Sequence, residues 1–228
     1  MTTRGGTASG SSESPTRTCR YELSPHVTRR VARQLGPLAR RVRFEHVDLN
    51  FAELPVERYD LIWSSGGFHC LLNLEHVLNQ VAGALRPGGI FVLHGWVGER
   101  RMQFDAARLA RANALLAEIP ARYRRVERIT PAPPWALSPF RGVRSNEILP
   151  LVHDRFDVVH ERLTGRVYPL AMVVDLDAIE RDDPALLERV LGVEAAARDD
   201  ATLRPGVVYG VYRRRVGHSP LTSRPRRQ

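Results

Sequence analysis

Two apolar runs in this chain end in side chains that could bind a ligand or take up a proton. Residues 59–65 end in Ser64 and Ser65, with His69 shortly after, and residues 90–93 are followed by His94. Serine hydroxyls both donate and accept hydrogen bonds, and a histidine with an ordinary pKa near ~6.5 can act as a general base. The alternative is that these side chains only cap turns or pack in the structure.

Two carboxylates stand at comparable places nearer the N-terminus. Glu22 precedes Leu23 and a Ser-Pro pair, and Asp48 precedes Leu49 at the end of the alternating run 42–48. An ionised carboxylate has two acceptor oxygens, which suit the hydroxyl or amino groups of a ligand. Two structural alternatives stay open, namely a surface glutamate beside a helix start and an aspartate in a turn.

Residues 59–97 form the segment that has to position the serines and histidines. Its two apolar runs are typical of strands buried on both faces. Between them lies a helical pattern behind Asn73, a residue that favours helix N-caps, and Pro87-Gly88-Gly89 turns the chain into the second run. The pattern predicts a strand–helix–strand unit with a right-handed crossover and parallel strands. The apolar positions of the helix are Leu74, Val77, Leu78, Val81, Ala82 and Leu85.

The flanking sequence indicates further strands and helices. Ser24 and Pro25 begin a helix that breaks near Gly36, and residues 42–48 form a strand that ends at Asp48. A helix runs from about 105 to 118, Ser145 caps a short helix, and strands follow at 156–163 and 207–212, with a helix opened by Asp183-Pro184 between them. The proline-rich stretch 130–144 reads as a loop or lid. This alternation predicts an α/β fold with a largely parallel sheet.

Composition favours one sizeable globular domain. The chain has 228 residues, of which 43% are hydrophobic and 26% charged. We expect residues 1–19 to be disordered, a domain at 20–213 with a helical insertion at about 99–153, and a disordered basic tail at 214–228. No apolar run approaches the ~20 residues that span a membrane. Cys19 and Cys70 lack metal-ligand spacing, which predicts free thiols in the reducing cytoplasm and no metal site.

The net charge of +9 does not by itself indicate a nucleic-acid partner. Six arginines without an acid lie in residues 213–228, and all 34 basic residues of the chain are arginine. This bias fits a GC-rich coding sequence better than selection for phosphate contacts. We therefore expect no nucleic-acid partner, with binding through the tail as the alternative.

The ordered pair Tyr-Asp-Leu-Ile-Trp at 59–63 and Leu-Arg-Pro-Gly-Gly-Ile-Phe at 85–91 resembles the fourth and fifth strands of class I S-adenosylmethionine-dependent methyltransferases. Residues 138–149 and 203–212 are similar to bacterial small-molecule members of this family. The resemblance implies a Rossmann-like, mostly parallel sheet whose last strand is antiparallel and lies beside the sixth.

The resemblance also implies S-adenosylmethionine as the cofactor and gives roles to the strand ends. Glu22, with Leu23 beside it, matches the end of the second strand, where the acid binds both ribose hydroxyls. Asp48 matches the end of the third strand, where the acid accepts from the adenine amino group and the amide of Leu49 meets a ring nitrogen.

At the fourth and fifth strands, Ser64 and Ser65 would face the methionine portion of the cofactor. His69 and His94 would lie where the family places its methyl acceptor, as candidate bases for a hydroxyl or an ammonium group. Trp96 would lie at the same place. Further candidates for lining the acceptor pocket, against the alternative of surface contacts, are Arg101, Gln103 and Trp135.

The family's first strand and its Asp-x-Gly-x-Gly-x-Gly turn should precede Tyr21. Residues 3–15 contain glycines but no apolar strand before them and no helix after them, so we expect the first strand and its helix to be missing. A truncated start, mistranslated first residues or a degenerate relative would each explain this. We expect methyl transfer to a small-molecule or sugar-linked acceptor, impaired by truncation. The alternative is a non-catalytic relative that binds a partner through its helical insertion.

Overall fold

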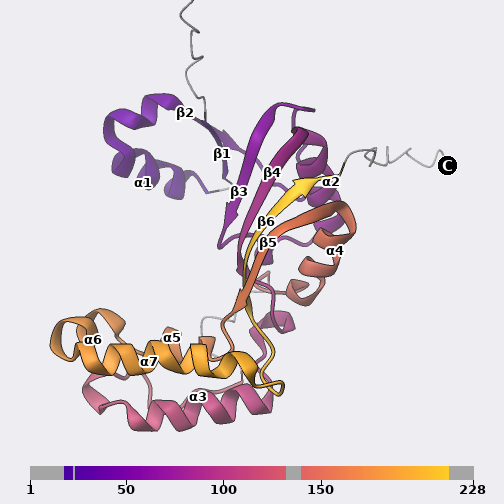
Figure 1. The fold of residues 1–228 in the computed structure, drawn as a ribbon. Helices are drawn as coiled ribbons and strands as arrows, with labels where there is room; N and C mark the ends of the chain where they lie inside the picture. The colour runs from indigo at the N-terminus through magenta and orange to yellow at the C-terminus, as the bar shows by residue number, and fades with distance from the viewer. Residues whose placement is uncertain (1–17, 23, 132–139, 216–228) are drawn as a thin grey trace, which may run out of the picture. The chain divides into compact units, whose positions relative to one another are not determined.

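A computed structural model describes residues 18–22, 24–131 and 140–215 (Figure 1). The chain divides into two compact units, one up to Leu49 and one from Asn50 onward. The expected disordered N-terminal segment, Leu23, Trp135 and most of the basic tail lie outside the described residues.

The first unit is a small strand–helix–strand motif. Strand β1 (Thr18–Glu22) leads into helix α1 (Pro25–Leu35), and after a 3-10 turn (Gly36–Arg41) the chain forms strand β2 (Val42–His46). The strands pair in parallel, with Glu22 opposite His46. Ser24 Oγ accepts the amide of Val27 at 3.4 Å, which confirms the predicted cap. Strand β2 ends two residues before Asp48, so the predicted strand end was wrong. None of the side chains described in this unit is fully buried.

The second unit is built on a four-stranded sheet in the order β3-β4-β6-β5. Its strands are β3 (Tyr59–Ser65), β4 (Leu85–Trp96), β5 (Phe156–Thr164) and β6 (Val207–Arg214). Strand β4 pairs in parallel with β3, whereas β6 pairs antiparallel with both β4 and β5. Three strands therefore run one way and the last strand runs the other way between β4 and β5. This arrangement confirms the predicted α/β, Rossmann-like sheet with an antiparallel last strand.

One face of this sheet is packed against helices α2 (Leu74–Ala84) and α4 (Ile148–Arg155), which Figure 1 shows on the same side of the strands. The core is aromatic around Phe91, whose ring lies 5.9 Å from Phe68, 5.4 Å from Phe156 and 6.1 Å from Tyr212. All four side chains are buried. Burial of this apolar surface is the main force that holds the helices on the sheet.

Helix α2 begins where the sequence predicted, although not by the predicted capping bond. Asn73 occupies the N-cap position, but its side chain makes no cap hydrogen bond. Instead the Asn73 side-chain amide donates to the carbonyl of Asn50 at 3.1 Å, while Asn50 Oδ1 accepts the amides of Leu72 and Asn73 at 2.8 and 3.0 Å. Asn50 thus fixes the chain that enters the helix.

The opposite face of the sheet keeps large side chains exposed. Trp63 on β3 is in register with Val92 on β4 and Val211 on β6. Trp63 is 64% exposed and Leu61, two residues earlier on the same face, is 53% exposed. This face of the unit therefore shows apolar surface that α2 and α4 do not cover.

Four helices form a second core beyond the strands of the sheet. They are α3 (Ala106–Glu118), α5 (Tyr168–Val173), α6 (Leu176–Asp182) and α7 (Pro184–Ala196), and Figure 1 shows them gathered beyond the carboxyl end of β5. The side chains of Asp105, Asp175 and Asp183 cap α3, α6 and α7. The buried residues between the helices include Leu116, Ile119, Tyr123, Leu170, Val173, Ile179 and Leu186.

Arg108 joins α3 to the chain around the sheet. Its side chain is fully buried, and its Nε donates to Glu99 Oε1 at 2.8 Å. Its Nη atoms donate to three carbonyls that lie far away in sequence, at 2.5 to 2.9 Å. These carbonyls belong to Gly165, Arg166 and Arg204. Because a buried charge is costly unless it is paired, this set of partners is what makes the buried arginine tolerable.

Candidate functional site

In the first unit the two predicted acidic residues lie at or just after the carboxyl ends of the two parallel strands. Glu22 is the last residue of β1, and Asp48 follows the end of the parallel strand β2 by two residues. Asp48 and Leu49 are half-buried. Leu23, the hydrophobic partner expected beside Glu22, lies outside the described residues.

In the second unit the structure brings Ser65 and His94 together. Ser64 and Ser65 end β3, and His94 stands opposite Ser65 on β4. Ser65 Oγ is 3.5 Å from His94 Nδ1, which is the long limit of a hydrogen bond. The chain then turns sharply at Gly66, whose φ is +77° and whose amide donates to the carbonyl of His94 at 2.8 Å. His94 itself is exposed.

His69 lies in a short 3-10 turn, Phe68–Cys70, just after that turn of the chain. Its Nδ1 is buried and has no hydrogen-bond partner. Burial lowers the pKa of His69, and the positive charge of Arg141 lowers it further. At neutral pH the ring is therefore uncharged and keeps a lone pair that can accept a proton.

Arg141 was not predicted from the sequence, yet it stands beside His69. The amide of the next residue, Gly142, donates to the carbonyl of His69 at 2.8 Å. Burial raises the pKa values of Cys70 and Tyr168, and the charge of Arg141 acts against both shifts. The guanidinium of Arg141 is thus electrostatically coupled to side chains from the Phe68–Cys70 turn and from α5.

The loop that carries Arg101 has a strained backbone and lies in close contact with the loop that carries Arg141. Arg101 and Met102 have φ values of 54° and 52°, in the left-handed region that residues other than glycine rarely adopt. The Arg101 amide donates to the carbonyl of Gly142 at 2.5 Å. A Cβ atom on Gly142 would lie 3.3 Å from the amide nitrogens of Arg101 and Met102, so glycine allows this close approach. Backbone strain of this kind often accompanies functional sites.

Ser145 is buried between the loop that carries Arg101 and the loop that carries Arg141. Its buried hydroxyl lies 3.0 Å from the carbonyl of Gly98, 2.9 Å from that of Glu99 and 3.1 Å from that of Gly142. The sequence had predicted a helix cap here, which was wrong, because α4 starts at Ile148 and Ser145 caps neither end. The single O–H of the serine is thus within hydrogen-bond distance of carbonyls from two different loops.

The other predicted acceptor-lining residues have different surroundings. Arg101 and Gln103 are exposed, whereas Trp96 is buried against Phe104 and Tyr168, with ring centroids 5.8 and 5.1 Å away. Trp135 lies outside the described residues. No pattern in the sequence could have distinguished Arg141 from the other arginines, because its position is defined by a contact with His69 that is distant in sequence.

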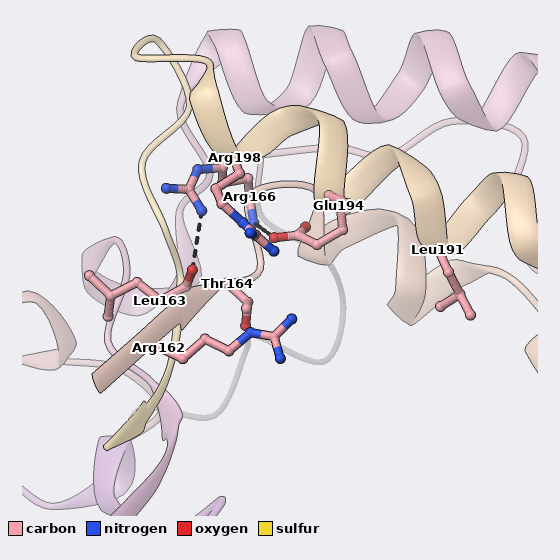
Figure 2. Close-up of a pocket in the computed structure, with 8 residues that line it drawn as sticks. Arg162, Leu163, Thr164, Arg166, Leu191, Glu194 and Arg198 are labelled. Carbon is pink, nitrogen blue, oxygen red and sulfur yellow. Dashed lines mark hydrogen bonds between the residues drawn. The ribbon is translucent and has the colours of Figure 1, made fainter. Parts of the chain in front are cut away.

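A separate pocket lies where β5 ends against α7 (Figure 2). In it Glu194 reaches from α7 toward Arg166 and accepts the amides of Arg166 and Val167 at 3.0 and 3.1 Å. Arg166 also donates to the carbonyl of Leu163 at 3.2 Å. None of the predicted site residues lines this pocket. Its lining consists of Arg162, Leu163, Thr164, Arg166, Leu191, Glu194, Ala195 and Arg198.

The described part of the chain shows neither a metal-binding cluster nor a membrane-spanning helix. In ranges 18–22, 24–131 and 140–215 no group of three or more histidine, cysteine, aspartate or glutamate side chains could hold a metal ion. Over the same ranges no helix is long and apolar enough to cross a membrane.

Comparison with known families finds one match. Residues 5–91 match the model of a methyltransferase domain. The matched stretch contains β1, α1, β2, β3, α2 and the start of β4, and so includes both segments, 59–63 and 85–91, that carried the resemblance. For this part of the chain the predicted family resemblance is confirmed. None of the curated proteins matches the chain significantly.

Solved structures that resemble the chain are distant. One is an S-adenosylmethionine-dependent methyltransferase from Mesorhizobium loti, with 21% identity, a TM-score of 0.49 and coverage of 87% of this chain and 80% of that one. A geranyl diphosphate methyltransferase in complex with S-adenosylmethionine has 16% identity, a TM-score of 0.49 and coverage of 87% and 69%. The cyclase SpnF has 16% identity, a TM-score of 0.47 and coverage of 88% and 67%. All three TM-scores are below 0.5, so the fold assignment rests on the strand pairings of the protein itself.

Proposed function

We propose that this chain, whose residues 5–91 match the model of a methyltransferase domain, transfers a methyl group from S-adenosylmethionine to a small-molecule or sugar-linked acceptor. The observation that carries the proposal is the strand order β3-β4-β6-β5 with β6 antiparallel to both neighbours. This is the order that the methyltransferase resemblance implied. A fold alone does not determine chemistry, so the residues at the strand ends provide the second support.

Acidic side chains of the first unit suit the adenosine half of the cofactor. We infer that Glu22, beside Leu23, accepts hydrogen bonds from the ribose hydroxyls, because a carboxylate offers two acceptor oxygens. We infer that Asp48 accepts from the adenine amino group and that the amide of Leu49 donates to a ring nitrogen. Both acids follow the carboxyl ends of parallel strands, where ligands of open α/β sheets bind.

The end of β3 suits the other half of the cofactor. We infer that Ser64 and Ser65 face its methionine portion, where hydroxyl groups can pair with an amino or a carboxylate group. S-adenosylmethionine supplies an electrophilic methyl group on a sulfonium. The protein therefore mainly has to hold the acceptor in line with that group and keep water out.

Of the two predicted bases, His69 is the better supported. Its lowered pKa keeps the imidazole neutral at pH 7, and its Nδ1 has no partner in the structure. A neutral imidazole beside the acceptor can remove the proton of a hydroxyl or an ammonium group before or during transfer. His94 is exposed and lies against Ser65, so we assign it a secondary role at the same edge of the sheet.

Calorimetry on the full chain tests the proposal. Titration with S-adenosylmethionine should give saturable heat for one site. Asp48→Asn should weaken binding roughly tenfold, because a hydrogen bond to a charged group contributes about 1.5–3 kcal/mol. Asp177→Asn removes an exposed carboxylate of α6 and should leave the affinity unchanged.

The absence of heat at millimolar cofactor would overturn the enzyme proposal. That result would favour the alternative of a non-catalytic relative that binds a partner. Location in a reducing cytoplasm remains a prediction from Cys19 and Cys70, both of which are free thiols.

A further inference from the structure

Arg141 differs from the other partly or fully buried arginines discussed above, because its side chain has no hydrogen-bond or ion-pair partner among the described residues. Its Nε is buried without a hydrogen bond, and over the described residues no hydrogen bond or ion pair of its side chain is found. Arg108 and Arg144 by contrast are fully engaged, Arg144 with Glu75 and Glu147 at 2.6 Å each. Arg166 also has a buried unpaired Nε, but its Nη1 donates to a carbonyl. A buried donor without an acceptor is costly and calls for an explanation.

A second unpaired group lies next to it. His69 Nδ1 is also buried without a partner, and the two loops touch through the hydrogen bond from Gly142 to the His69 carbonyl. The charge of Arg141 also acts on Tyr168, where it opposes the rise in pKa that burial causes. Two buried polar groups from neighbouring loops thus lack hydrogen-bond partners, and among the described residues no acidic side chain forms an ion pair with Arg141.

The residues that follow Arg141 are held by several hydrogen bonds. Arg144, three residues later, lies between Glu75 and Glu147 and lowers the pKa of Glu75 to about 2 through its hydrogen bond. Ser145 and Arg101 fix the same loop through Gly142. A pre-organised cation with unused donors is what anion recognition requires, because little ordering remains to be done on binding.

We propose that the methyl acceptor carries a carboxylate or phosphate group and that Arg141 binds this group beside His69. The inference rests on the proposed function, because it names the class of substrate for that same site. The planar guanidinium offers two parallel N–H donors that match either anion. If His69 donates its Nδ1–H to the bound anion, that tautomer leaves the lone pair on Nε2, where it can take the acceptor's proton.

Binding of simple anions to the full-length chain tests the inference. Inorganic phosphate and benzoate are titrated separately while the imidazole signals of His69, assigned with His69→Gln, are followed by NMR. At least one probe should shift these signals saturably, and the stronger probe indicates whether the acceptor group is phosphate or carboxylate. Arg141→Gln should weaken binding at least tenfold. Arg141→Lys, which keeps the charge but loses the planar fork, should be intermediate.

The matched control is Arg111→Gln, which removes one exposed arginine of α3 and should bind the probe like the wild type. Equal affinity in the wild type and in Arg141→Gln would overturn the inference, as would an equal loss in Arg111→Gln, which would indicate a general charge effect. If Arg141→Gln does not fold, Arg141→Lys becomes the deciding variant. An anion affinity and His69 signals equal to those of the wild type in Arg141→Lys would then refute anion binding by Arg141.

Calorimetry with S-adenosylmethionine separates the two proposals. Cofactor binding in Arg141→Gln should equal that of the wild type. An Arg141-dependent anion site in a chain that does not bind the cofactor would refute the proposed function but keep the anion site. If the chain binds the cofactor but binds the anion equally well in the wild type and in Arg141→Gln, this inference is refuted and the proposed function stands.

Discussion

At the scale of single residues, the pKa of His69 reports on Arg141. Burial is the larger cause of its lowered pKa and the charge of Arg141 the smaller one, and both disfavour the imidazolium ion. Arg141→Gln removes only the smaller cause. We expect the pKa of His69 to rise in this variant and to stay below about 6.5, the ordinary value. A pH titration of the His69 NMR signal measures it.

Arg111→Gln should leave that pKa where it is, because Arg111 is exposed on α3. A pKa that does not move in Arg141→Gln would mean that the guanidinium is screened by solvent or points away from His69. The lowered pKa of His69 also makes the stability of the fold depend on pH. Because the folded-state pKa is depressed, His69 supports the fold above pH ~6.5, and that support is lost as the pH falls through the folded-state value.

Residue types at strand ends could be predicted from the sequence, whereas Arg141 could not. Ser64, Ser65 and His94 follow apolar runs whose length and pattern already indicate strands. The interest of Arg141 comes only from the loop contact with His69 and from its buried Nε, which has no hydrogen-bond partner among the described residues. Both are tertiary facts, and an arginine in a proline-rich stretch of an arginine-rich chain carries no local signal.

At the scale of elements, a capping residue or a long apolar pattern decided which helices could be predicted. The starts of α1 and α7 were predicted from Ser24 and from Asp183-Pro184, and Ser24 and Asp183 do cap these helices. Helix α3 was predicted from its apolar positions, and Asp105 caps it. Helices α5 and α6 were missed, since they have only six and seven residues and too few turns for a periodic pattern. The missed helices matter, because Tyr168 of the proposed site begins α5.

The buried hydrogen bonds of Arg108 should contribute strongly to holding α3 against the chain around the sheet. Arg108→Met keeps much of the side-chain volume but leaves Glu99 and three carbonyls without their donor. Breaking a buried charged network costs about 3–5 kcal/mol, so the urea midpoint of unfolding should fall markedly. Arg111→Met on the same helix is the control and should change stability by less than about 0.5 kcal/mol. Similar stability of both variants would show that the network contributes little.

At the scale of the whole molecule, the two units differ in how much they bury. The second unit has an aromatic core under the sheet and a second core among its helices. In the first unit no described side chain is fully buried, although α1 is correctly capped and the strands pair in register. Local sequence signals predicted α1 and most of β2, whereas β1 was expected only from the family resemblance. They did not predict the thin packing of the unit, which depends on what the elements pack against.

This contrast predicts unequal hydrogen exchange along the chain. Amides of residues 18–49 should exchange well before those of β4 and β6, because few apolar contacts have to open in the first unit. Exchange measured by mass spectrometry on the full chain tests this directly. Protection in residues 18–49 equal to that in β4 would show that the first unit is held by more than its own packing.

S-adenosylmethionine turns the same measurement into a test of the proposed cofactor residues. If Glu22 and Asp48 bind the adenosine half, cofactor at about a hundred times its dissociation constant should stabilise the first unit by about 2.7 kcal/mol, which slows its exchange roughly a hundredfold. The slowing should be lost in Asp48→Asn and kept in Asp177→Asn. Protection confined to residues 59–97 would contradict the roles of Glu22 and Asp48 while leaving those of Ser64 and Ser65 in place.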